Sequence, residues 1–180
     1  MKKTTKRNKM FEIEFSAPDI YFELSKIEKL KNTKFSQDTC VIRRETQTDY
    51  FIQAELEVPI NDNKKPFYFD IWVSVSKEDF ERYTQTRKDP VEDEAYEGYL
   101  ANKLPYYSDT RLLKAYVRPS KDGFPWLELF HNMHPLTVHV SYGMYVQDAE
   151  EILQLVKDEV KEARARKPKS VSEVQNQHAC

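Results

Sequence analysis

Two stretches in the first half of the chain alternate between apolar and polar residues, the pattern of a β-strand with one buried face. They cover residues 50–58 and 67–76, and their apolar positions carry mostly large aliphatic and aromatic side chains. The connection between them, residues 59–66, has a proline at each end, and proline stops a strand from extending its ladder. The pattern therefore predicts an antiparallel hairpin with a long loop.

Shorter runs predict further strands. Residues 40–44 are rich in β-branched side chains, and residues 112–118 and 124–130 flank a short turn that ends in Gly123. A glycine there supplies the positive φ that such turns need, so the two flanking runs form a second predicted hairpin. Residues 136–140 are apolar enough to form one more strand.

Apolar residues at helical spacing predict the helices. Ser16 is a candidate N-cap for a helix over residues 16–31, and Ser76 is a candidate N-cap for the helix that follows the hairpin. Residues 94–104 form a weaker helical segment.

The clearest helix lies near the C-terminal end. Asp148 and Glu151 form a capping box, an apolar stripe follows them, and Pro168 ends the pattern. The order helix, strands, helix, strands, helix predicts an α+β fold. We expect a mainly antiparallel sheet with flanking helices and a long C-terminal helix.

Length and charge divide the chain into a body and two tails. Its 180 residues suit one domain, which we expect over residues 11–167, with a disordered basic tail at 1–10 and a disordered polar tail at 168–180. The formal net charge is −2, but residues 1–9 carry +5 and the body from 10 to 156 carries −9. Such a body repels a phosphate backbone, so we do not expect a nucleic-acid partner. The alternative is nucleic-acid binding through the basic tail alone, at residues 2–9.

The sequence also limits where the protein acts. No apolar run is long enough to span a membrane, and no apolar region follows the basic N-terminus as in a signal peptide. The two cysteines, Cys40 and Cys180, do not form a disulfide framework. We therefore expect a cytoplasmic protein without a membrane partner, and the oligomeric state stays open.

The chain has only three glycines, Gly98, Gly123 and Gly143. A dinucleotide fingerprint, a phosphate-binding P-loop and a nucleophile elbow each need glycines closer together than these. These common enzyme classes are therefore excluded, and we expect no cofactor.

Several stretches together resemble one bacterial family, the domain-of-unknown-function family numbered 2199. The most specific are Trp72-Val-Ser-Val-Ser76 and His134-Pro-Leu136, and the others are residues 35–42, 69–83, 96–100, 104–106, 110, 113–114 and 126–129. The family has no assigned activity, so the resemblance implies a bacterial origin and a fold boundary but no catalytic residue. Some members carry a paired-cysteine piece before the domain, which this chain lacks, and Phe130-His-Asn-Met133 also departs from the family pattern.

Three histidines close to a carboxylate are one candidate site. His131, His134 and His139 fall within nine residues, near Glu128, and imidazoles with a carboxylate suit zinc. Pro135 argues against the helix that would place two of these histidines on one face. Surface or capping histidines are the commoner alternative.

A second candidate site is nucleophilic. Cys40 could act with Asp38 and the distant His134 as thiol, orienting group and base. A single cysteine in a β-branched run is more often a small buried apolar residue.

Acidic and tyrosine residues interleave in a third candidate, a patch for a basic protein partner. The patch consists of Glu92, Asp93, Glu94, Tyr96, Glu97, Tyr99, Tyr106 and Tyr107. The alternative is a solvated acidic loop with some of the tyrosines in the core.

Our leading hypothesis is a non-enzymatic protein-binding domain with an acidic, aromatic surface, which could neutralise a basic toxin or nuclease. The alternative is a small hydrolase or metal-dependent enzyme that uses Cys40 or the three histidines.

Overall fold

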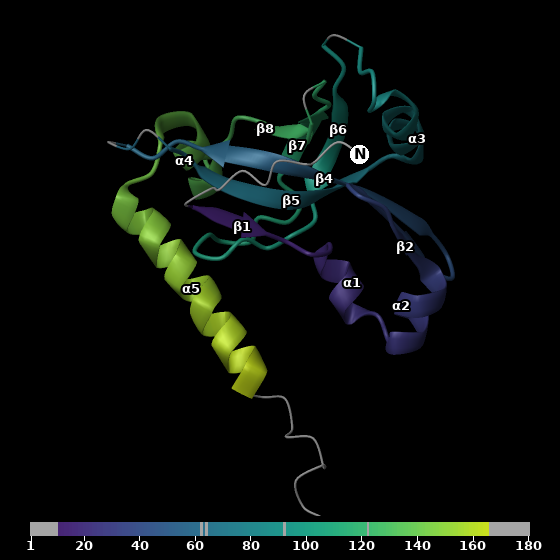
Figure 1. Cartoon of the computed structure of the whole chain (residues 1–180), viewed down its shortest axis with the longest axis horizontal. Coiled ribbons are helices and arrows are strands. Elements are labelled where there is room, and N and C mark those ends of the chain that lie inside the picture. The colour runs from purple at the N-terminus through teal and green to yellow at the C-terminus, as the bar shows by residue number, and fades with distance from the viewer. Residues whose placement is uncertain (1–10, 62, 64, 92, 122, 166–180) are drawn as a thin grey trace, which may run out of the picture.

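The computed structural model describes residues 11–61, 63, 65–91, 93–121 and 123–165, and these residues form an α+β fold (Figure 1). Its strands are β1 (Glu12–Glu14), β2 (Thr33–Phe35), β3 (Thr39–Arg43), β4 (Thr48–Val58), β5 (Phe67–Val75), β6 (Tyr96–Leu100), β7 (Lys114–Arg118) and β8 (Trp126–Leu129). Its helices are α1 (Asp19–Glu23), α2 (Lys26–Asn32), α3 (Lys77–Thr86), α4 (Pro135–Tyr142) and α5 (Val146–Ala165). Both predicted hairpins are confirmed, since β4 pairs antiparallel with β5 and β7 with β8.

The sheet closes into a barrel of five strands, which the sequence did not predict. Strands β4 to β8 follow one another antiparallel, and β8 returns to β4 in a parallel pairing of Glu55 with Trp126. The backbone N–H of Glu55 donates to the carbonyl of Pro125 at 2.9 Å. Strand β3 occupies the first half of the same β4 edge, β2 follows β3, and β1 pairs parallel with β5. The predicted antiparallel sheet is therefore mixed.

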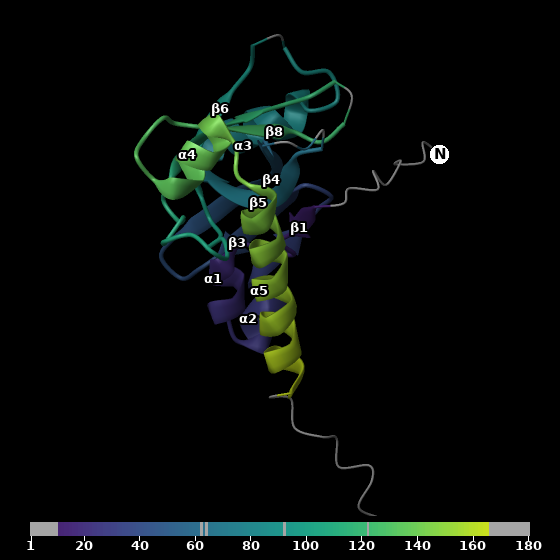
Figure 2. The same ribbon diagram turned by 90° about the vertical axis from the view of Figure 1, so that its left-hand side faces the viewer.

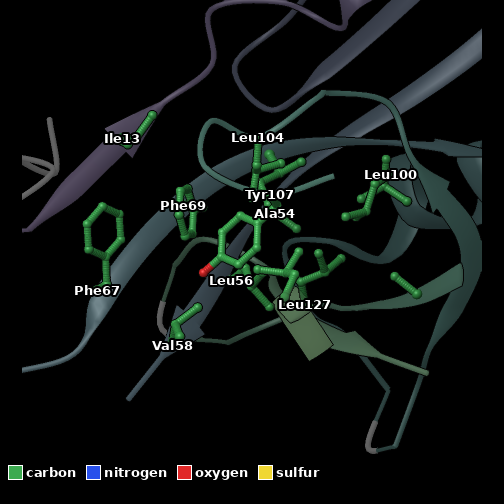
Figure 3. Packing of buried hydrophobic residues seen from close by; sticks show 14 of the residues in the cluster. Ile13, Ala54, Leu56, Val58, Phe67, Phe69, Leu100, Leu104, Tyr107 and Leu127 are labelled. Carbon is green, nitrogen blue, oxygen red and sulfur yellow. The ribbon is translucent and has the colours of Figure 1, made fainter. Parts of the chain in front are cut away.

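The barrel interior is the main hydrophobic core (Figure 3). Strand alternation sends Ala54, Leu56 and Val58 of β4 and Phe67 and Phe69 of β5 inward, and all five are fully buried. Burying a valine, leucine or phenylalanine side chain contributes about 1.5–3 kcal/mol, so the hairpin is a main source of hydrophobic stabilisation.

A second, smaller core covers the outer side of β3–β5. It contains Cys40, Ile42, Phe51 and Trp72, against which side chains of α1 pack. Trp72 Nε1 and Gln53 Nε2 both donate to the carbonyl of Phe15, at 2.7 and 2.9 Å. Both faces of this hairpin are thus buried at its centre, and these bonds satisfy two of its side-chain donors.

The helix predicted over residues 16–31 is wrong as one element. It is two short helices, because Leu24 is extended and Ser25 starts α2 with a complete capping box to Glu28. Asp19, at the start of α1, accepts hydrogen bonds from Asn102 Nδ2 at 3.0 Å and from the N–H of Lys103 at 2.8 Å. A local cap and a long-range contact therefore divide the segment.

Two other predictions are wrong in type. Residues 96–100 form strand β6, not a helix, because Tyr96, Gly98 and Leu100 alternate inward. Residues 136–140 belong to helix α4, not a strand. Proline fits the first turn of a helix, where its missing N–H is not needed, so Pro135 starts α4 and His134 caps it.

The long helix α5 begins at Val146, so Asp148 is not its N-cap. The carboxylate of Asp148 lies in the first turn and accepts from the N–H of Tyr145 at 2.9 Å. The predicted tails at 1–10 and 168–180 and the helix end at Pro168 lie outside the described residues, and the boundaries 11–167 stay a prediction. Within the described ranges, no helix combines the length and apolar character needed to cross a bilayer.

Candidate functional site

Three neighbouring strands of the barrel present an aromatic and charged outer surface. Because side chains alternate along a strand, those that follow the buried residues of β6, β7 and β8 point to solvent. We call this surface the β6–β8 face, made of Glu97, Tyr99, Lys114, Tyr116, Arg118, Trp126, Glu128 and Phe130.

Cross-strand contacts hold the side chains of the β6–β8 face in place. Lys114 Nζ lies 2.9 Å from Glu97 Oε1 and 4.6 Å from the ring centre of Phe130. The hydrogen bond to Glu97 raises the pKa of Lys114. Arg118 links two more strands, since its Nε lies 2.6 Å from Glu128 Oε2 and its guanidinium carbon lies 5.6 Å from the ring centre of Trp126. These pairs hold large rings in an ordered arrangement at the surface.

A groove of about 530 Å³ opens at one end of this face. Trp126, which is 47% exposed, forms part of its wall together with Arg118 and Glu128. The connection from α3 to β6 and the turn after β7 supply the other lining residues, Pro90, Val91, Asp93, Glu94, Pro119 and Lys121. The groove thus combines an indole ring, proline rings and carboxylates.

Glu94 is the most enclosed carboxylate of the groove, with only 5% of its side chain exposed. Thr86 Oγ1 donates to Glu94 Oε2 at 3.0 Å and also lies 2.9 Å from the hydroxyl of Tyr96. Burial raises the pKa of Glu94, but hydrogen bonds to Tyr96 and Thr86 and the nearby Arg82 lower it more. The net effect keeps Glu94 ionised, so a fixed negative charge lies in the groove wall.

A second polar cluster anchors α3, the helix that precedes the connection lining the groove. The hydroxyl of Tyr83 and Nη1 of Arg87 donate to the two carboxylate oxygens of Asp38. Burial raises the pKa of Tyr83, so its hydroxyl stays a donor. Asp38 therefore serves as a structural acceptor between the β2–β3 loop and α3.

The predicted nucleophilic site does not assemble. Cys40 is fully buried in the second core beside Phe51 and Trp72, and burial raises the pKa of its thiol to about 12. Nucleophilic cysteines need a thiolate in an accessible place. Asp38 binds Tyr83 and Arg87, and His134 contacts neither Asp38 nor Cys40 through any of its hydrogen bonds.

His134 does form a serine–histidine pair, which the sequence did not suggest. Its Nε2 lies 2.9 Å from Ser108 Oγ, and its Nδ1 accepts from the N–H of Leu136 at 3.2 Å. An acceptor Nδ1 carries no proton, so Nε2 of the neutral ring must carry it. In that tautomer His134 donates to Ser108 and cannot take its proton, so the pair does not make an activated nucleophile.

The histidines predicted for a metal do not gather either. His131 is exposed, His139 Nδ1 lies 3.0 Å from the hydroxyl of Tyr107, and Glu128 pairs with Arg118. Among the residues that the structure describes, no three His, Cys, Asp or Glu side chains are placed to hold a metal ion. The candidate ligands His131, His134, His139 and Glu128 therefore do not form such a group in the described part of the chain.

The predicted acidic–tyrosine patch divides into three groups. Asp93 and Glu94 line the groove, and Glu97 and Tyr99 lie on the β6–β8 face. Tyr96, by contrast, is fully buried inside the barrel.

Tyr106 and Tyr107 lie elsewhere, against α4 and α5. Glu92 lies outside the described residues. Sequence reasoning missed Trp126, Arg118 and Lys114, although the alternation of residues 112–118 and 124–130 could have placed them on the outer surface.

Comparison with known proteins identifies a family for most of this fold. No curated protein and no solved structure matches the chain. The family described as "Uncharacterized protein conserved in bacteria (DUF2199)" matches residues 4–144, which include the whole barrel and α4 and end before α5. The chain therefore belongs to this uncharacterised bacterial family.

Proposed function

We propose that this protein is a cytoplasmic, non-enzymatic protein-binding domain whose working surface is the β6–β8 face with its groove. The observation that carries the proposal is Trp126, a half-exposed indole in the groove wall beside the buried carboxylate of Glu94. Exposed tryptophan, tyrosine and arginine side chains contribute most to protein interfaces.

The chemistry of the groove favours a basic partner, such as a toxin or nuclease that the protein would neutralise. Glu128 is already paired with Arg118 and Glu94 with Arg82, so the exposed Asp93 is left to meet a partner's lysine or arginine. Indole and proline rings can cover the apolar stem of such a side chain. The body charge of −9 over residues 10–156 would speed the encounter.

The test is affinity capture from a bacterial lysate with the full chain, at low and high salt. We expect a basic protein to be captured, and we expect Trp126→Ala and Asp93→Lys each to reduce its recovery by about tenfold or more. The matched control is Glu150→Lys on α5, which makes the same charge change on another surface and should leave recovery unchanged.

The proposal fails if no protein is captured at either salt concentration. It also fails if the control variant loses the partner as strongly as Asp93→Lys, because the interaction would then follow net charge and not this surface.

A further inference from the structure

Trp126 forms part of the groove wall, and the sheet fixes its backbone but not its ring. The residue starts β8, lies opposite Glu55 of β4 and Arg118 of β7, and is 47% exposed. These pairings set the direction of its Cα–Cβ bond, whereas a half-exposed indole can still change rotamer. A ring that changes rotamer in the free protein loses that freedom when a partner binds, which lowers the affinity.

Few side chains are placed to hold this indole. In both views of the molecule, α2 and α5 extend away from the end where β6 and β8 lie (Figure 1, Figure 2). Among the described residues, no aromatic ring stacks on Trp126, and the cation over its ring is that of Arg118, whose guanidinium carbon lies 5.6 Å from the ring centre. Arg118 therefore makes the specific contact to the exposed ring.

Arg118 is itself fixed by its neighbours on the sheet. Its Nε lies 2.6 Å from Glu128 Oε2, and its guanidinium carbon lies 5.9 Å from the ring centre of Tyr116, two residues before it on the same side of β7. Tyr116 packs in turn on Phe130, with 4.6 Å between the ring centres. Only 27% of the Arg118 side chain is exposed. The arginine thus rests on a pair of rings and a carboxylate, and it can support the more exposed indole of Trp126.

The chemistry of arginine suits such a support. Its guanidinium is planar, so it can bond to a carboxylate through Nε while its flat face lies against a ring, which the ammonium group of lysine cannot do. The same combination recurs behind Glu94, where the guanidinium carbon of Arg82 lies 5.6 Å from the ring centre of Tyr96 and Nη2 lies 3.5 Å from Glu94. Two carboxylates of the groove are therefore each joined to a ring by an arginine.

We infer that Arg118 is the positioning residue of the groove: its guanidinium, fixed by Glu128 and Tyr116, holds the indole of Trp126 in one orientation on the groove wall. Arg118 acts through Trp126 and needs no contact of its own with a partner. The order of the ring is a property of the free protein, and only its effect on affinity rests on the proposed function. A ring that is already ordered loses less conformational freedom on binding.

The experiment measures the motion of the Trp126 indole in the free, full-length chain by NMR relaxation of its Nε1–H group. Trp72, whose Nε1–H donates to the carbonyl of Phe15 at 2.7 Å, is the rigid reference in the same molecule. We expect an order parameter of about 0.85 for both indoles in the wild type. In Arg118→Met, which keeps the stem but removes the guanidinium, the Trp126 value should fall below about 0.6. An unchanged Trp72 value shows that the fold is intact.

The matched control is Arg111→Met, which removes the same charge and an ion pair of the same length, 2.6 Å to Asp109, and should leave Trp126 as ordered as before. Glu128→Gln is a second variant, which removes the charge that fixes Arg118 and should also loosen the indole. The inference is overturned if the indole is mobile in the wild type, if both variants leave it ordered or if the control loosens it equally. Because no partner is present, a failed capture experiment contradicts the proposed function alone.

Discussion

Apart from the buried Tyr96, the acidic–tyrosine patch has two halves with opposite roles. Asp93, Glu94, Glu97 and Tyr99 border the groove and the β6–β8 face, whereas Tyr106 and Tyr107 attach a loop to α4 and α5. In the second half, the hydroxyl of Tyr106 donates to Asp148 at 2.9 Å and Tyr107 bonds to His139. The comparison shows that tyrosines beside acids can lie on an exposed surface or form an internal anchor, and the packed neighbours decide which.

The largest expected effect comes from comparing two variants, each of which removes one tyrosine from one half. Tyr107→Ala should lower the free energy of unfolding by about 3–5 kcal/mol, because it leaves a cavity in the main core and an unpartnered His139 nitrogen. Tyr99→Ala, at a residue that is 44% exposed, should change it by no more than about 0.5 kcal/mol. Urea unfolding at pH 7.5 measures both. Equal losses in the two variants would contradict the division into surface and anchor.

An intermediate effect is expected at Gly98, in the first half. A Cβ there would lie 2.3 Å from the carbonyl oxygen of Ser74 and 2.7 Å from a methyl group of Val73, so Gly98→Ala should destabilise the protein by about 1–3 kcal/mol. In a helix, the same substitution would stabilise it by about 1 kcal/mol. The sign of the change in thermal unfolding thus decides between strand β6 and the helix that periodicity predicted.

The smallest expected effect is on the pH dependence of stability, through His134 at the start of α4. Burial lowers the pKa of His134 from its ordinary value of 6.5, so the folded state favours the neutral ring that caps α4. The unfolded chain binds the proton more readily, so this stabilisation is complete above pH 6.5 and is lost as the pH falls through the lower folded value. In urea unfolding at pH 7.5 and 5.5, His134→Asn should keep the cap and show a smaller loss of stability than the wild type. His131→Asn, at an exposed residue, is the control and should behave as the wild type.

Local signals explain which elements could be predicted. The β4–β5 hairpin follows from strict alternation, and α3 follows from Ser76, whose hydroxyl accepts from the N–H of Asp79 at 3.0 Å. Strand β6 and helix α4 could not be assigned in this way, because each is short and its apolar residues fit either period. Long-range contacts, such as β6 between β5 and β7, selected the conformation.

By itself, the sequence determined the α+β class, the two hairpins, the long C-terminal helix and the family, because these depend on local periodicity, capping and motif spacing. Only the tertiary structure decided that the sheet closes into a barrel. The barrel closes where β4 pairs parallel with β8, through Glu55 and Trp126, which are far apart in the chain. It also decided that Trp126 faces solvent while Cys40 is buried in the second core. Burial and proximity arise from packing between distant segments, so composition alone could name candidate residues but could not separate an exposed surface from a core.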